Sequence, residues 1–262
     1  MAGCWPIGSD VTAAFSKCVF ITLFKLSFDL DFRSSMTIMT DGQLLYGGRM
    51  KPLQRARSET AKLEREDSIL MTTEILLRQS GYDSMTMQAV ATAAGLAKGT
   101  IYLYFTSRES LVLAVYGRLF DSWIDRFAVH KPEFISFDGF CRDFAKHYAD
   151  DPLFLQLTGF ANAFLEPQLD REAYIKSKRG MARRVKRLAG LVCQQFSIAP
   201  AAAQKLIWGF LTIAGGTAQM TVSPPITKAD LPDDVVAFTG VANFETVFLN
   251  AAAPLGTNLI SR

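Results

Sequence analysis

The stretch Ala89–Phe105, which reads AVATAAGLAKGTIYLYF, decides the fold of this chain of 262 residues. It begins with small residues that suit a helix, is interrupted at Gly95, and resumes with Lys98 ahead of Tyr102 and Tyr104. Two helices joined by a tight turn that contains glycine form a helix-turn-helix. Glycine adopts the backbone angles of such a turn without a side-chain penalty. The stretch therefore predicts a helix-turn-helix.

Helical signals continue on both sides of this stretch. Upstream, apolar residues recur at helical spacing until Gly81, which suits the end of a helix, and Thr86 is suited to cap the next one. Downstream, Ser107 is suited to cap a helix whose apolar stripe runs over residues 111–127. Further amphipathic segments cover residues 134–149, 152–166, 171–196, 200–222 and 233–251. Because no alternating strand pattern follows residue 50, the sequence predicts an all-α fold.

The start and outer side of the helix after Gly95 carry groups that a core does not need. A recognition helix places its N-terminal residues at base edges in the major groove. Lysine and tyrosine bind phosphate oxygens, whereas threonine bonds a base and leucine touches a thymine methyl group. Gly99 has no side chain to hold the helix away from DNA. The candidate DNA contacts in this helix are Lys98, Gly99, Thr100, Tyr102, Leu103 and Tyr104.

Four runs of residues closely resemble the TetR (AcrR-type) family of transcriptional regulators: Gly81-Tyr82, Thr86-Met87, Ala94–Phe105 and Ser107–Leu111. The resemblance covers residues 50–112. It implies a homodimeric, all-helical repressor whose first three helices bind a palindromic operator and whose C-terminal domain binds a small inducer. By position, it implies DNA contacts from Thr86, Lys98, Thr100, Tyr102, Tyr104 and Arg108. The expected domains are a helix-turn-helix domain over residues 51–110 and a helical ligand-binding and dimerisation domain over residues 111–262.

The charge of the chain does not by itself indicate a nucleic-acid or membrane partner. The formal net charge is +3, and between Met50 and Ser110 eight Lys and Arg residues are matched by seven Asp and Glu residues. A general positive field is therefore too weak to hold DNA. Individual, placed contacts must do so.

Cysteine and histidine usage predicts no metal site, and we expect no cofactor. The cysteines are Cys4, Cys18, Cys141 and Cys193, and none of them forms a CxxC pair. Scattered thiols suit a reducing compartment, so we expect a cytoplasmic protein. We interpret Cys141 as a buried thiol and His147 as a histidine on a helix surface.

The first fifty residues carry no motif or helical period that ties them to the helix-turn-helix. Residues 19–24 have the hydrophobicity of a signal-peptide core, but the run is short and no small-residue cleavage site follows it promptly. It is also too short to span a bilayer, and we expect no membrane association. Met36, Met39 and Met50 lie downstream. We therefore expect residues 1–50 to be a poorly ordered extension or a misassigned start.

Phenylalanines are dense over the two predicted helices 134–149 and 152–166. Ordinary core packing explains any single one of them. As a group they are also suited to line an apolar cavity, because small-molecule sites are mostly hydrophobic and lie between helices. The candidate ligand-binding residues are Trp123, Phe127, Phe140, Phe144, Phe160 and Phe164.

The segment 171–196 carries a basic face opposite an apolar face. This pattern is typical of an amphipathic helix with its charges in solvent. Lys178 and Arg184 lie nearer the apolar side, so they are the better candidates for a buried role.

Two C-terminal segments are apolar on more than one side. Residues 200–222 have two apolar faces, and residues 233–251 have a stripe too wide for one contact. A helix that is apolar on two sides needs two neighbours, so these segments suit a four-helix dimer interface of the kind that the resemblance implies. The candidate interface residues are Phe210, Ile213, Thr217, Val241, Phe244 and Phe248.

Together these patterns predict a homodimeric, ligand-responsive regulator, a repressor that a small apolar or amphipathic molecule releases from a palindromic operator on double-stranded DNA. The alternative is a DNA-binding regulator controlled by a protein partner or by no ligand. Catalysis is the rival class, but His147 has no evident nucleophile partner and the chain has no phosphate-binding glycine loop. We therefore expect no enzyme activity.

Overall fold

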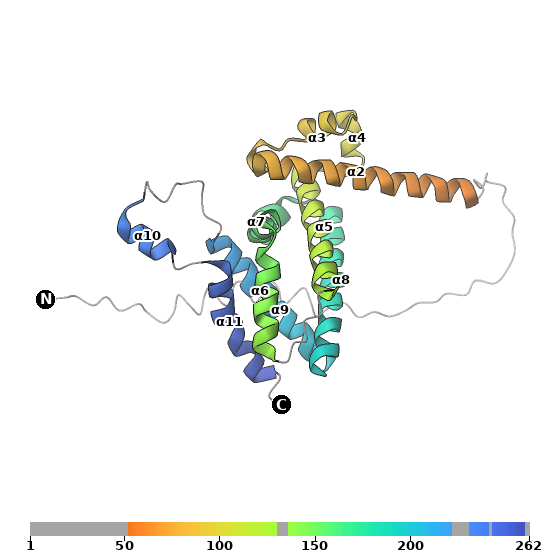
Figure 1. The fold of residues 1–262 in the computed structure, drawn as a ribbon. Helices are drawn as coiled ribbons and strands as arrows, with labels where there is room; N and C mark the ends of the chain where they lie inside the picture. The colour runs from red at the N-terminus through yellow and green to blue at the C-terminus, as the bar shows by residue number, and fades with distance from the viewer. Residues whose placement is uncertain (1–51, 130–135, 222–230, 241–242, 260–262) are drawn as a thin grey trace, which may run out of the picture. The chain divides into compact units, whose positions relative to one another are not determined.

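The computed structural model describes the chain over residues 52–129, 136–221, 231–240 and 243–259, and every element in these ranges is helical (Figure 1). The predicted all-α fold is confirmed. Residues 1–50, the expected extension, lie outside the described residues. Of the helices within these ranges, none alone is long and apolar enough to cross a membrane, and one bent pair, Arg171–Phe196 with Pro200–Thr221, passes that test only when joined.

Three helices form the N-terminal part of the described chain: α2 (Pro52–Ser84), α3 (Met87–Ala93) and α4 (Lys98–Tyr102). The expected break at Gly81 lies inside α2, where the backbone leaves helical geometry at φ 72° and ψ 178°. This positive φ favours glycine, because a Cβ atom makes it costly. Thr86 caps α3 as predicted, since its hydroxyl oxygen accepts a hydrogen bond from the Ala89 amide at 3.1 Å.

The long helix α5 (Arg108–Val129) connects this part to the rest of the chain. Its predicted cap is confirmed, because the Ser107 hydroxyl oxygen accepts a hydrogen bond from the Ser110 amide at 3.1 Å. The predicted stripe is buried at Leu111, Val115, Leu119, Trp123, Ile124 and Phe127. Since α5 packs against α2 and also against α6, α7 and α8, it belongs to both predicted domains.

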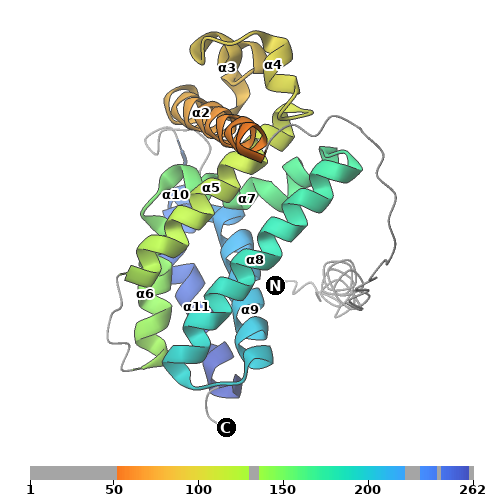
Figure 2. The same cartoon turned by 90° about the vertical axis from the view of Figure 1, so that its right-hand side faces the viewer.

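The C-terminal part is a bundle of further helices (Figure 2). They are α6 (Phe137–Ala149), α7 (Pro152–Phe160), the π-helix η1 (Ala161–Leu165), the 3-10 turn η2 (Glu166–Gln168), α8 (Arg171–Phe196), α9 (Pro200–Thr221), α10 (Asp233–Gly240) and α11 (Phe244–Leu259). Helix α9 packs against α7, α8 and α11, so it is the central helix of this bundle.

One predicted helix, residues 233–251, is two helices in the structure. The second of them begins after Asn243, whose side-chain oxygen accepts a hydrogen bond from the Thr246 amide at 2.8 Å. Asparagine is among the best residues for capping a helix, and it starts α11 here. The apolar spacing of 233–251 concealed this boundary, so the prediction of one continuous helix was wrong.

Aromatic rings from several helices fill the centre of the bundle. The Trp123 ring lies 5.1 Å from the rings of Phe144 and Tyr148, measured between centroids, and 5.2 Å from the ring of Phe127. The ring of Phe248 on α11 stacks on Phe144 at 5.3 Å. These contacts join α5, α6 and α11 in one core beneath the helix-turn-helix.

Candidate nucleic-acid interface

The turn between α3 and α4 is fixed by backbone geometry and by three buried side chains. Gly95 has a φ of 65°, which suits a residue without a Cβ atom. The Leu96 amide donates a hydrogen bond to the Ala91 carbonyl at 2.9 Å across the turn. Ala91, Ile101 and Phe105 are buried, so the inner side of α4 is held against α3 and the core.

The opposite side of α4 faces solvent. Leu103 is 80% exposed and Tyr102 is 45% exposed, and Lys98 and Gly99 are exposed as well. Because the side chains of Leu103 and Tyr102 are exposed, they contribute little to the packing of the core. Nothing lies within 4 Å of a Cβ atom placed on Gly99, so the surface over this residue is open. The outer side of α4 therefore has the exposure that a contact surface requires.

Thr86 and Thr100 flank this surface. Thr86 is exposed, and its oxygen caps α3 as an acceptor, so its hydroxyl proton stays available for a further hydrogen bond. Thr100 is half-buried in the first turns of α4. Both hydroxyl groups lie on the same short run of helix-turn-helix as Lys98.

Tyr104 and Arg108 differ from the other candidates because both also pack against the protein. Tyr104 is half-buried against the core. The Arg108 guanidinium lies 3.8 Å from the centre of the Tyr82 ring, and in the described structure its buried Nε has no hydrogen-bond partner. Burial raises the pKa of Tyr82, and the nearby guanidinium only partly offsets that effect. Sequence reasoning missed this pairing because residues 82 and 108 belong to different helices.

The candidate ligand-binding residues form two groups. Four of them, Trp123, Phe127, Phe140 and Phe144, are buried in the aromatic core. The other two, Phe160 and Phe164, lie at the junction of α7 with η1, with ring centroids 5.7 Å apart, and Phe164 is 52% exposed.

The aromatic core also holds polar atoms that sequence reasoning missed. The hydroxyl groups of Tyr148 and Thr158 are 3.2 Å apart, and Tyr116 lies 3.5 Å from the same threonine oxygen. Burial raises the pKa of both tyrosines. Within the described chain, the indole Nε1 of Trp123 is buried without a hydrogen-bond partner. Tyr116 lies on the buried side of α5. A tyrosine among the apolar residues of this helix was the sequence feature that could have indicated a buried polar group.

The expected dimer residues need a correction. Phe210, Thr217, Phe244 and Phe248 are buried within the protomer, where a partner chain has no access to them. The reason is that α9 meets its several neighbours inside its own chain. Ile213 is half-buried, and Val241 lies outside the described residues.

The exposed side of α9 carries different residues. Trp208 is 42% exposed, and Thr212, Gly216 and Gln219 follow it on the same face of the helix. Nothing lies within 4 Å of a Cβ atom placed on Gly215 or Gly216. This face of α9 thus has one large exposed apolar side chain, followed two turns later by small residues that another helix is able to approach closely.

The remaining sequence interpretations concern charged and sulfur groups. The Arg184 side chain is 14% exposed and donates hydrogen bonds of 3.1 and 2.6 Å to Asp121, whereas the Lys178 side chain is 34% exposed and donates one of 2.6 Å to Glu166. Both charges are therefore half-buried and paired. Cys141 is buried, and this burial raises the pKa of its thiol to about 12. In the part of the chain that the structure describes, no group of His, Cys, Asp and Glu is arranged to hold a metal ion.

Two family models match this chain. The model of bacterial regulatory proteins of the TetR family matches residues 69–115, which include the helix-turn-helix. The model of the tetracyclin repressor-like C-terminal domain matches residues 117–253, more than half of the chain.

Individual relatives match over a limited part of this chain. The HTH-type transcriptional repressor KstR of Mycobacterium tuberculosis is 40% identical over 86 residues, which are 30% of this chain and 39% of that protein. KstR of Rhodococcus jostii is 39% identical over 64 residues, 24% of this chain and 30% of that protein. The chain thus spans well under half the length of these curated relatives.

Two solved structures are similar over a longer range. A TetR-family transcriptional regulator from Streptomyces coelicolor has 16% identity and a TM-score of 0.48, over 76% of this chain and 82% of that one. The regulator FadR from Bacillus subtilis, in complex with stearoyl-CoA, has 16% identity and a TM-score of 0.44, over 74% of this chain and 97% of that one. With both of its domain models matched in order, the chain belongs to the TetR family of bacterial regulatory proteins.

Proposed function

We propose that the protein is a homodimeric transcriptional repressor that binds a palindromic operator through α4 and releases it when a small apolar or amphipathic molecule binds the C-terminal bundle. The observation that carries this proposal is the outer side of α4, where Leu103 and Tyr102 are exposed while Ile101 behind them is fully buried. A helix anchored on one side and open on the other is suited to enter a major groove. The KstR relatives, which are named as repressors, support the same direction of control.

The DNA contacts divide by chemistry. Lys98, Tyr102 and Thr86 reach phosphate oxygens, while Thr100 and Leu103 meet base edges and Gly99 allows the close approach. Tyr104 and Arg108 contact phosphates from positions that their packing partly fixes. A fixed side chain loses less conformational entropy on binding than a free one.

Selection from a pool of random duplexes tests this function. The purified full-length protein is mixed with the pool, the retained duplexes are sequenced, and repeated rounds enrich the preferred sequence. We expect an inverted repeat whose half-sites lie about 34–36 Å apart, or a multiple of that distance, since two recognition helices read one face of the duplex. A pool that stays random would contradict sequence-specific binding.

Lys98 allows a test of the phosphate contacts. We expect Lys98→Ala to weaken binding to the selected and to random duplexes alike, because a phosphate contact carries no sequence information. The slope of log K against log salt concentration should shrink by about one unit for each half-site. Lys186→Ala, which removes an exposed lysine on α8, is the matched control and should leave the slope unchanged. An unaltered slope in Lys98→Ala would remove this residue from the interface.

Trp123 marks the place we propose for the effector. A buried N–H group without a partner costs free energy, and a ligand that brings a hydrogen-bond acceptor recovers it. The surrounding rings of Phe127, Phe140 and Phe144 suit the apolar part of an amphipathic molecule, and the buried hydroxyl groups of Tyr116 and Tyr148 suit a second polar group. We assign Phe160 and Phe164, at the junction of α7 with η1, to the same proposed site as further apolar contacts.

The indole N–H group gives the corresponding prediction. A panel of amphipathic molecules, including long-chain carboxylic acids and sterols, is screened for compounds that raise the melting temperature and release the selected duplex. Trp123→Phe should respond about tenfold less sensitively to such a compound, because one buried hydrogen bond contributes about 1–2 kcal/mol. The free variant should lose no more than about 1–2 kcal/mol of stability, since its aromatic packing is largely kept. An equal response would place the effector elsewhere, and no response to any compound would favour control by a protein partner or by no ligand.

A further inference from the structure

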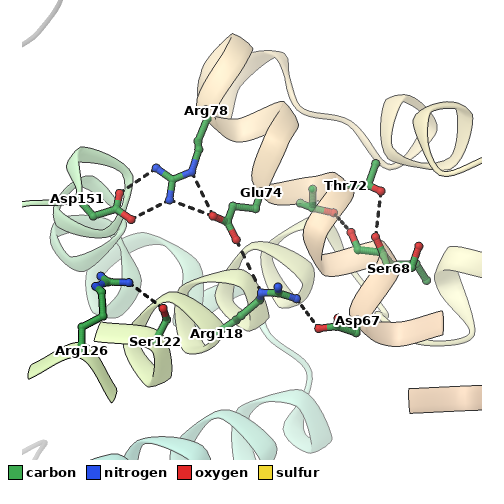
Figure 3. Close-up of polar contacts among 11 residues, drawn as sticks. Asp67, Ser68, Thr72, Glu74, Arg78, Arg118, Ser122, Arg126 and Asp151 are labelled. Carbon is green, nitrogen blue, oxygen red and sulfur yellow. Dashed lines mark hydrogen bonds and ion pairs between the residues drawn. The ribbon is translucent and has the colours of Figure 1, made fainter. Parts of the chain in front are cut away.

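The last turns of α2 contact α7 through a paired arginine and carboxylate (Figure 3). The two terminal nitrogens of Arg78 donate hydrogen bonds to the two carboxylate oxygens of Asp151, at 2.9 and 2.7 Å. Such a two-point contact fixes the orientation of both groups as well as their distance. Asp151 directly precedes Pro152, the first residue of α7, so the contact joins the DNA-binding part to the bundle.

Further charges hold Arg78 from its other side. The guanidinium also donates to Glu74, from Nε at 3.1 Å and from Nη2 at 3.0 Å. Glu74 in turn faces Arg118 of α5 at 3.8 Å, and Arg118 pairs with Asp67 near the middle of α2. The series Asp67, Arg118, Glu74, Arg78, Asp151 alternates in sign and crosses from α2 to α5, back to α2 and then to α7 (Figure 3).

Asp151 is committed to two partners at once. Its Oδ1 caps α7 by accepting hydrogen bonds from the amides of Leu153 and Phe154, at 3.0 and 3.2 Å. Burial raises the pKa of this carboxyl, but the hydrogen bonds from Arg78 and from these amides outweigh it, and the pKa is lowered overall. The carboxylate is therefore charged and held in place at neutral pH.

A second contact lies at the other end of α7. The ring of Tyr82, just after the break at Gly81, lies 6.3 Å from the ring of Phe160, the last residue of α7. Tyr82 also carries the Arg108 guanidinium on its face, at the start of α5. Both ends of α7 thus meet the last part of α2, one through charge and the other through aromatic contact.

The exposure of the ion pair limits what it does for stability. The Arg78 side chain is 39% exposed, and partly exposed ion pairs contribute little to the free energy of unfolding. A two-point pair inside a network of charges nevertheless strongly restricts the orientation of the two paired side chains relative to each other. Its main consequence is geometric, because α2 carries α3 and α4, and a rotation of α2 changes where the recognition helix points.

We propose that Arg78 is a positioning residue for operator binding, which acts through Asp151 to hold α2 at a fixed angle on α7. This inference rests on the proposed function, because it concerns the spacing of two recognition helices in a dimer. When the pair is intact, the two copies of α4 match half-sites at one separation. When the pair is absent, α2 is less constrained, and the dimer tolerates other separations while binding the selected one less tightly.

The variants are chosen to separate this contact from the fold. Arg78→Met keeps the aliphatic stem and removes the charge. Asp151→Ser keeps a good capping residue for α7 and removes the acceptor for Arg78. The double variant tests whether the two residues act through each other. Arg126→Met is the matched control, because Arg126 is exposed and, among the described residues, donates its hydrogen bond within its own helix, to Ser122 at 2.7 Å (Figure 3).

Each full-length protein is measured against the duplex selected by the wild type, against the same duplex with its half-sites moved apart by one base pair, and against random DNA. We expect each single variant to bind the selected duplex about 5- to 20-fold less tightly, in line with measured couplings between contacting residues. Its preference for the native spacing should fall, while random DNA binding and the melting temperature stay close to those of the wild type. The double variant should lose no more than either single variant.

The outcomes divide clearly. Single variants that keep the wild-type affinity and spacing preference would overturn the inference, and so would a double variant whose loss equals the product of the two single losses. A loss that Arg126→Met shares would show an effect of charge alone and would also overturn it. If the wild type selects no sequence, the proposed function fails, whereas a selective wild type with unaltered variants refutes only the role of Arg78.

Discussion

Replacing Gly99 with glutamate is expected to abolish operator binding while the fold stays intact. The space over this glycine is open, with nothing within 4 Å of the position that a Cβ atom would take, so the larger side chain fits the free protein. Gly99 is the second residue of α4, and a negative charge near a helix N-terminus is favourable. Against DNA the same carboxylate faces phosphates, and like charges brought together cost several kcal/mol. We expect binding to the selected duplex to fall more than about 100-fold.

The control for this variant is Gly190→Glu. Gly190 is an exposed glycine in α8, and its Cβ position is equally open, so the two variants add the same charge to the protein. Fluorescence anisotropy with the selected duplex measures affinity, and thermal melting measures the fold. If Gly99→Glu binds like the control variant, α4 does not enter the groove, and the exposed residues on its outer side serve another partner.

Local features of this fold were predictable because they depend on neighbours in the sequence. Thr86 and Ser107 cap the helices that follow them with hydrogen bonds to amides three residues on. Gly81 and Gly95 take positive φ angles at the two expected breaks. A cap or a turn is decided within one helical turn, so the residue types alone indicate it.

Whether an apolar helix face packs against its own chain or against a partner chain was not predictable in the same way. Phe210 and Trp208 are two residues apart on α9, and Phe210 is fully buried while Trp208 is 42% exposed. Both apolar faces of α9 are buried within the protomer, one at Phe210 and the other at Ile207, and periodicity does not say whether an apolar face meets its own chain or a partner chain. The answer depends on where α7, α8 and α11 lie. These helices pack against α9 within the protomer, so the expected dimer residues on α9 are buried there.

Pairings between residues far apart in the chain could not be predicted from the sequence either. Arg78 and Asp151 are 73 positions apart, one in the last turns of α2 and the other at the cap of α7. Likewise, position alone indicated a phosphate contact for Arg108, whereas the structure also stacks it on Tyr82. The exposed residues of α4 were easier to predict, because the inner side of this short helix packs on the core and the outer side is left in solvent.

The second prediction with a large expected effect concerns dimer assembly through the exposed face of α9. We propose that α9 of one protomer meets its partner across Trp208, Thr212, Gly216 and Gln219, where the two glycines of the segment let backbones approach. An exposed tryptophan is the kind of residue that dominates binding energy at an interface. Trp208→Glu replaces it with a charge that has no partner there, so the dimer should dissociate at micromolar concentration.

Dissociation should reduce operator binding by about 100-fold or more, because a monomer holds one half-site and loses the effective concentration that a linked second site supplies. Val129→Glu is the matched control: Val129 is 85% exposed at the end of α5, outside the proposed α9 surface, so this variant should stay dimeric and bind normally. Light scattering gives the mass of each variant, and the selected duplex gives its affinity. Because the Trp208 side chain is not part of the protomer core, the melting temperature of the Trp208→Glu monomer should fall only through the lost association. A Trp208→Glu protein that remains a dimer with full affinity would place the interface on another face, and α11 would then be the helix to examine by the same substitution of an exposed residue.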